Sequence, residues 1–170
     1  MLCGELYAAD STNGTVPVSG DGSVPLAHVA LVETNGFGVQ LFLVEGDKFF
    51  TDWEKPEPPH ITPVLVARRG VPIRTVIVYV GAGLKSDGSA DVTYDALVFK
   101  PDGSAYGRES DLTVAQGVDP APGELHRACK YAGIRIEPKD PAGVYTVEVV
   151  VRDKVKKVEL RLTRKFTVEE

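Results

Sequence analysis

The last third of the chain alternates apolar and polar residues with a period of two. Tyr145, Val147, Val149 and Val151 share one face of a first segment. A second segment places its apolar residues in the same way, at Val158, Leu160, Leu162, Phe166 and Val168. Such alternation is typical of antiparallel strands with one face in the core and one in water. Arg164 interrupts the second apolar face, so we expect a β-bulge or an exit to the sheet edge there.

Similar patterns occur upstream, from Ile61 onwards. Residues 92–99 alternate, whereas residues 75–80 are apolar at nearly every position, as in a central strand covered on both faces. Pro63 suggests that residues 61–70 form a strand at a sheet edge. Residues 106–124 show little periodicity and predict an irregular crossing connection. About seven short strands with turn-rich links and no long helical pattern predict a β-sandwich.

Before Ile61 the chain divides into two parts. Residues 1–24 are rich in small, polar and turn-forming residues and predict a flexible arm. Residues 25–59 contain a predicted hairpin followed by KFFTDW, and we expect strands that pack on the main domain. The proline-rich stretch 54–60 cannot continue a sheet ladder and marks a boundary. The expected sandwich therefore spans residues 60–170.

Composition excludes some kinds of partner. The 170 residues carry a net charge of −5, whereas a nucleic-acid partner usually requires a basic face. No run of about 18 apolar residues occurs, so we expect no membrane span. The first residues lack the basic and apolar regions of a signal peptide, so either the protein is cytosolic or its signal has been removed from this sequence. Cys3 and Cys129 could pair in an oxidising compartment, but a free terminal thiol and a small buried thiol are the simpler interpretation.

The segment Gly143-Val144-Tyr145 resembles the entry to the penultimate strand of immunoglobulin-like domains. There the tyrosine hydroxyl bonds back to the backbone in a tyrosine corner. Asp140 lies one residue earlier than the acidic residue of that motif, and Val147 stands where antibody domains place their second cysteine. The resemblance implies an all-β, immunoglobulin-like antiparallel β-sandwich, here with an N-terminal strand extension and no inter-sheet disulfide.

Three longer stretches extend this resemblance to a group of small, uncharacterised secreted bacterial proteins. They read FFTDWEKP, VTYDALVFKPDGSAYG and IRIEPKDPAGVYTVEVVVRD. This similarity implies an extracytoplasmic location, periplasmic or secreted, and brings no activity with it.

Candidate chemistry is sparse. His126 and Cys129 lie three residues apart, but two ligands are too few for a structural zinc site. The spacing of Asp87, Ser89 and Asp91 resembles the start of a calcium loop, yet a turn explains it better. Carboxylates available for glycoside hydrolysis, none of them singled out by the sequence, are Asp52, Glu54, Asp95, Glu109 and Asp111. We therefore expect no metal, no cofactor and no enzymatic activity.

The aromatic residues Phe49, Phe50 and Trp53 are the remaining lead. An exposed aromatic platform could stack on a sugar. The segment could instead pack on the sandwich as an extra strand. We favour packing, because large aromatic side chains are usually buried. The sequence thus predicts an extracytoplasmic, non-enzymatic domain for protein binding, adhesion or an accessory role. Its partner would be another protein or a second copy of the chain, met at a sheet edge. The alternative is a carbohydrate-binding module that uses these three aromatics.

Overall fold

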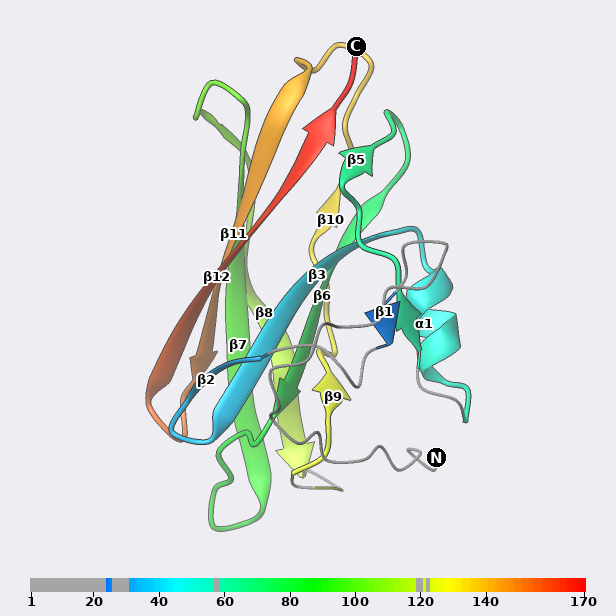
Figure 1. The fold of residues 1–170 in the computed structure, drawn as a ribbon. Coiled ribbons are helices and arrows are strands. Elements are labelled where there is room, and N and C mark those ends of the chain that lie inside the picture. The colour runs from blue at the N-terminus through cyan, green and yellow to red at the C-terminus, as the bar shows by residue number, and fades with distance from the viewer. Residues whose placement is uncertain (1–23, 26–30, 57–58, 119–120, 122) are drawn as a thin grey trace.

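The computed structural model describes residues 24–25, 31–56, 59–118, 121 and 123–170, so most of the expected arm at 1–24 lies outside the described residues. Two β-sheets pack face to face (Figure 1). The first sheet has the strand order β5-β12-β11-β7-β8, with bounds Val66–Ala67, Val158–Val168, Gly143–Asp153, Ser89–Phe99 and Ala105–Val118. The second has the order β10-β6-β3-β2, with bounds Gly133–Ile134, Ile73–Val80, Phe37–Glu45 and Val32–Thr34. The predicted all-β, two-sheet fold is confirmed.

Three short elements complete the molecule. Strand β9 (His126–Arg127) pairs with β6 beside β10. Strands β1 (Val24–Pro25) and β4 (His60–Ile61) form a two-stranded ribbon. Helix α1 (Lys48–Trp53) lies on the side of the second sheet that faces away from the first (Figure 1). No helix in the part of the chain that the structure describes is long and apolar enough to span a membrane.

Burial follows the predicted alternation in the first sheet. Every second residue of β7 is buried, and the inward residues of β11 and β12 join the same core. Removing this apolar surface from water is the main force that holds the sheets together.

Strand β6 is covered on both faces, as its nearly continuous apolar run predicts. Ile73 and Ile77 belong to the core between the sheets, whereas Val76 and Val78 belong to a second cluster on the outer face. That second cluster is closed by Phe49 of α1 and Ile61 of β4. The segment before residue 60 thus supplies both a neighbouring strand, β3, and part of the outer cover.

The expected irregular connection at 106–124 is wrong over most of its length, because residues Ala105–Val118 form strand β8. This strand lies at the edge of its sheet and is largely exposed. Its pairing with β7 also contains three register shifts. Each shift moves the following side chains to the other face. Hydrophobic periodicity could therefore not reveal this strand, which is held by its backbone hydrogen bonds to β7.

Of the two alternatives expected at Arg164, the β-bulge is wrong. The ladder between β11 and β12 runs without a shift and pairs Arg164 with Val147. The guanidinium group instead reaches β3, where Nε donates to the Leu41 carbonyl oxygen at 2.9 Å and Nη2 to Gln40 Oε1 at 2.5 Å. An inward arginine is tolerated because it satisfies acceptors along β3.

Arg164 is one of several links along the seam between β12 and β3. At one end, Lys156 Nζ donates to the Asn35 carbonyl oxygen at 2.8 Å. At the other, the chain before β5 bonds to both sheets, since Val64 N donates to Leu43 O and Thr167 N donates to Leu65 O, each at 2.8 Å. The seam thereby draws the two sheets together along one side of the sandwich.

The fold is not a plain immunoglobulin sandwich. Strand β5 pairs with β12 in parallel, the edge beyond β6 is divided between β9 and β10, and the second sheet curls into a half-barrel. One feature of the resemblance is present, because Tyr145 is fully buried and its hydroxyl donates to the Pro141 carbonyl oxygen at 2.9 Å.

Candidate functional site

Helix α1 brings the predicted aromatic residues onto the second sheet. It begins after Asp47, whose carbonyl oxygen accepts from Phe50 N at 3.1 Å. The segment is a helix and not the extra strand expected from the sequence. Phe49 and Trp53 are four residues apart, and they share a face both in a strand and in a helix. The pattern of a six-residue segment could therefore not distinguish a strand from a helix.

The three aromatics mainly pack against the protein itself. Phe49 is 5% exposed, and Phe50 and Trp53 are partly buried against the same outer cluster. The ring centroids of Phe49 and Trp53 lie 5.7 Å apart, and those of Phe50 and Tyr131 lie 4.9 Å apart. The packing role that the sequence favoured is therefore what these side chains have.

Two arginines cover the neighbouring rings. The Arg127 guanidinium carbon lies 5.4 Å from the centroid of Phe50, and that of Arg74 lies 4.9 Å from Tyr131. Tyr131 remains 41% exposed. We call Phe50, Trp53, Tyr131, Arg74 and Arg127 the aromatic–arginine cluster.

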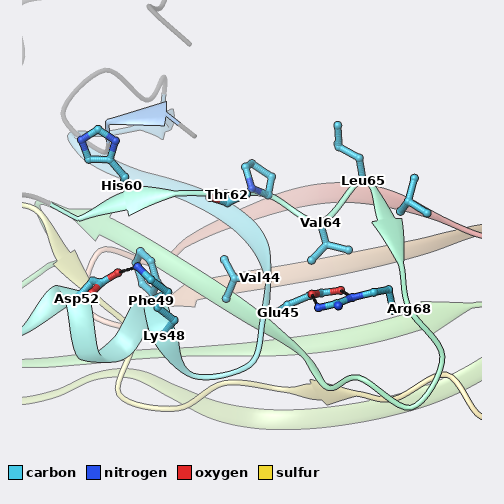
Figure 2. A pocket seen from close by; sticks show the side chains of 12 residues that line it. Val44, Glu45, Lys48, Phe49, Asp52, His60, Thr62, Val64, Leu65 and Arg68 are labelled. Atoms are coloured by element: carbon cyan, nitrogen blue, oxygen red, sulfur yellow. Dashed lines mark hydrogen bonds and ion pairs between the residues drawn. The ribbon is translucent and has the colours of Figure 1, made fainter. Parts of the chain in front are cut away.

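A pocket of about 670 Å³ lies beside this cluster, between the end of β3, helix α1 and residues 60–68. Val44, Phe49 and Val64 are the buried apolar residues that line it. Figure 2 shows the chain from His60 to Leu65 along one side. Leu65 exposes 73% of its surface there, and Val66 49%. We call this hollow the α1 pocket.

Ion pairs line the α1 pocket, with their cations outermost. Lys48 pairs with Asp52, and Arg68 pairs with Glu45 at 2.5 Å between Nη2 and Oε2 (Figure 2). Lys48 and Arg68 expose 84% and 72% of their side chains, against 15% for Asp52 and 27% for Glu45. Hydrogen bonds from Lys48 and then Lys55 lower the pKa of Asp52, and the hydrogen bond to Glu45 raises the pKa of Arg68. Both shifts favour the charged forms of Asp52 and Arg68, and in each pair the cationic side chain is the more exposed partner.

The other histidine and cysteine candidates are separate from the α1 pocket. His126 Nε2 lies 3.0 Å from the Ala121 carbonyl oxygen, and its ring lies 5.4 Å from that of Tyr79. Cys129 is exposed, so the expectation of a buried thiol is wrong at this position. Within the described ranges, no group of three or more histidine, cysteine or acidic side chains is placed to hold a metal.

The Asp-Gly-Ser sequences at 87–89 and 102–104 form turns. Asp87 Oδ1 accepts from the backbone nitrogen of Ser89 at 2.9 Å and from its hydroxyl at 2.6 Å. Asp102 and Ser104 repeat this arrangement at 2.9 and 2.7 Å. These hydrogen bonds lower the pKa of both aspartates, and the turn interpretation is confirmed.

The candidate glycosidase carboxylates lie in two separate regions of the fold. Asp52 and Glu54 belong to α1 and its end, whereas Asp95, Glu109 and Asp111 belong to β7 and β8. Asp95 accepts from Asp111 N and from Arg152 Nη1, both at 2.9 Å. The backbone bond from Asp111, followed by Arg152, lowers the pKa of Asp95. The structure does not bring these five carboxylates together.

Several residues of this region were not identified from the sequence. Tyr131 and the two arginines come from segments far from α1 and meet Phe50 only through the fold. A signal for the pocket wall did exist in Val64-Leu65-Val66. Three consecutive apolar residues in an extended segment cannot all face one core, so at least one is exposed unless both faces are covered.

Neither protein-family models nor the curated proteins contain a match to this chain. Among solved structures, it is similar to part of a family 123 glycoside hydrolase from Clostridium perfringens, described for its hydrolysis of glycolipid glycans. The TM-score is 0.38 with 13% sequence identity, and the match covers 77% of this chain. It spans 28% of that hydrolase chain.

Proposed function

We propose that this chain is a non-enzymatic, extracytoplasmic domain of immunoglobulin-like architecture that binds another protein through the α1 pocket. The observation that carries this proposal is the position of Leu65, which is 73% exposed at an apolar hollow. Large apolar side chains beside a concave surface are typical of interaction sites. A partner side chain seated there would cover Leu65 and Val66.

Strand order supports the immunoglobulin-like part of the proposal. The series β12-β11-β7-β8 corresponds to the G-F-C-C′ order of a variable-type domain, and β6 lies between β3 and β9/β10 as strand B lies between A and E. The tyrosine corner at Tyr145 is a further point of agreement. The resemblance to secreted bacterial proteins supports the extracytoplasmic location.

The pocket is a better candidate interface than the edges of the first sheet. The exposed part of β8 carries Arg108, Glu109 and Asp111, and its pairing with β7 contains register shifts. Charges and bulges of this kind discourage strand addition. The opposite edge of the same sheet is bonded across the seam by Arg164 and the chain around Val64.

A carbohydrate-binding module remains the second candidate, because Tyr131 is 41% exposed beside Phe50. Trp53, the chain's one tryptophan, packs against Phe49 and reports on this region by fluorescence. A sugar bound at the cluster would change Trp53 emission. Tyr131→Ala should abolish this change in emission, and Leu65→Ser should leave it intact. The opposite dependence would support the α1 pocket.

A selection from a random peptide display library, with the full chain as bait, tests the primary proposal. Selected clones are measured again on Leu65→Ser and on Val144→Ser. Val144 is a matched control, because it is a 48% exposed aliphatic residue on β11. We expect binding to be lost with Leu65→Ser and retained with Val144→Ser. Clones that bind both variants equally, or a selection that enriches no Leu65-dependent clone, would overturn the proposal.

A further inference from the structure

Charge at the rim of the α1 pocket narrows the class of partner. We propose that the pocket recognises an extended protein segment in which a bulky apolar residue is flanked by carboxylates. This inference rests on the protein-binding function proposed above. It follows from three features of the pocket. The cations of its ion pairs face solvent, its floor is apolar, and some of the backbone groups in its wall are already hydrogen-bonded.

The cations are the accessible halves of the rim ion pairs. Asp52 lies beneath two lysines, since Lys55 Nζ is 2.6 Å from Asp52 Oδ1 and Lys48 pairs with Oδ2. Glu45 likewise lies beneath Arg68. The cationic side chains are 61–84% exposed, and exposed ion pairs contribute little to stability. A carboxylate arriving from solvent therefore meets cationic groups that can turn towards it at small cost.

This local charge is opposite to the charge of the whole chain, which is −5. At physiological ionic strength, charges separated by more than about 8 Å are largely screened. The exposed rim cations are then among the charges nearest to a bound segment. Such an arrangement favours one docking position for an acidic segment.

The floor of the pocket supplies an anchor site. Phe49 and Val64 are 5% and 7% exposed and, with Val44, give an apolar surface beneath the rim. The volume of about 670 Å³ falls within the range of pockets that hold an organic group. One large apolar side chain fits this floor, and Leu65 and Val66 lie exposed at its edge.

The backbone of the wall is already used, which makes side chains the basis of recognition. Val64 N is bonded to Leu43 O and Leu65 O to Thr167 N, and Pro63 has no N–H to donate. These bonds leave fewer backbone groups of the wall free to pair with a further strand. The anchor side chain and the charges beside it are therefore the main source of the proposed specificity.

The peptides selected above test this inference by their composition. We expect Leu65-dependent clones to be enriched in an apolar residue with Asp or Glu one or two positions away. The most enriched clone is then resynthesised with its acids replaced by Asn or Gln, and separately by Lys. Affinity for the full chain, measured by isothermal calorimetry, should fall with the amide replacement and fall further with lysine.

Charge-reversed protein variants give the complementary test. Lys48→Glu and Arg68→Glu should each lower the affinity for the acidic peptide by about tenfold or more. Lys139→Glu is the control, because Lys139 is exposed and its reversal changes the net charge by the same amount. This variant should have little effect on the affinity. The neutral variants Lys48→Gln and Arg68→Gln, with unchanged thermal unfolding, separate recognition from folding. Leu65-dependent clones that are neutral or basic, or equal effects of all three reversals, would overturn the acidic preference and leave the proposed function standing. A selection that yields no Leu65-dependent clone would overturn both the acidic preference and the proposed function.

Discussion

The hydroxyl of Thr75 on β6 lies 2.9 Å from the hydroxyl of Tyr94 on β7, and so joins the two sheets within the core. The backbone nitrogen of Ala132 lies 2.8 Å from each of these oxygens. Burial raises the pKa of Tyr94, which keeps its hydroxyl protonated. One small polar network thus fixes both sheets and the chain after β9.

Replacing Thr75 with valine should destabilise the protein by about 1–3 kcal/mol, because it leaves buried groups with fewer partners. Urea unfolding followed by circular dichroism measures this change. Thr93→Val is the matched control on β7, because the buried Thr93 hydroxyl has no hydrogen-bond partner among the described residues. That variant should be neutral or stabilising. Equal losses in the two variants would contradict a specific role for the network.

Tyr145→Phe should cost roughly 0.5–1.5 kcal/mol, since it removes the hydrogen bond to Pro141 O and leaves the ring packed against Phe166. The free energy of unfolding in urea measures the effect. Tyr131→Phe, at a residue that is 41% exposed, should change stability much less. A stability of Tyr145→Phe equal to that of the unsubstituted chain would remove the tyrosine corner as a stabilising feature.

Arg164→Met should destabilise the protein by about 1–2 kcal/mol, because the Leu41 carbonyl and the Gln40 side chain each lose a donor. Hydrogen exchange measured by mass spectrometry should also show faster exchange in β3. Arg161→Met on the same strand is the control, since Arg161 points to solvent and pairs with Glu159. Equal exchange in the two variants would show that the seam does not depend on Arg164.

Asp95→Asn should alter the dependence of stability on pH. The pKa of Asp95 is lower in the folded protein than its ordinary value of about 3.9. Its ionised form therefore stabilises the fold above that value, and this contribution is lost as pH falls through the folded pKa. The stability difference between the two proteins should be largest near neutral pH and should vanish in strong acid. A difference that stays constant with pH would show that Asp95 does not act through its charge.

The periodic segments were the most predictable part of the fold. In β7, β11 and β12 the alternation of residue types matches the alternation of burial along each strand. The pattern is reliable there because β7 and β11 are internal strands of the first sheet and one face of that sheet packs on the core. It failed for β8, where an exposed edge and register shifts remove the pressure for alternation.

The candidate site was less predictable. Phe49, Phe50 and Trp53 were found because aromatic clusters are visible in any sequence, and their mostly packed state agrees with the interpretation that was favoured. Leu65 and Arg68 were missed, because a pocket depends on how α1 and the chain around β5 lie against β3. Tyr131 was missed for the same reason, since it meets Phe50 across 81 positions of sequence.

The sequence by itself determined strands β11 and β12, the inward residues of β7 and the two-sided burial of β6. Those properties follow from local periodicity, which each segment carries without reference to its neighbours. Only the tertiary structure decided that KFFTDW is helical, that Arg164 bonds across the seam to β3, and that Leu65 stands exposed beside a hollow. These outcomes depend on free energies of contact between distant segments, which override weak local preferences.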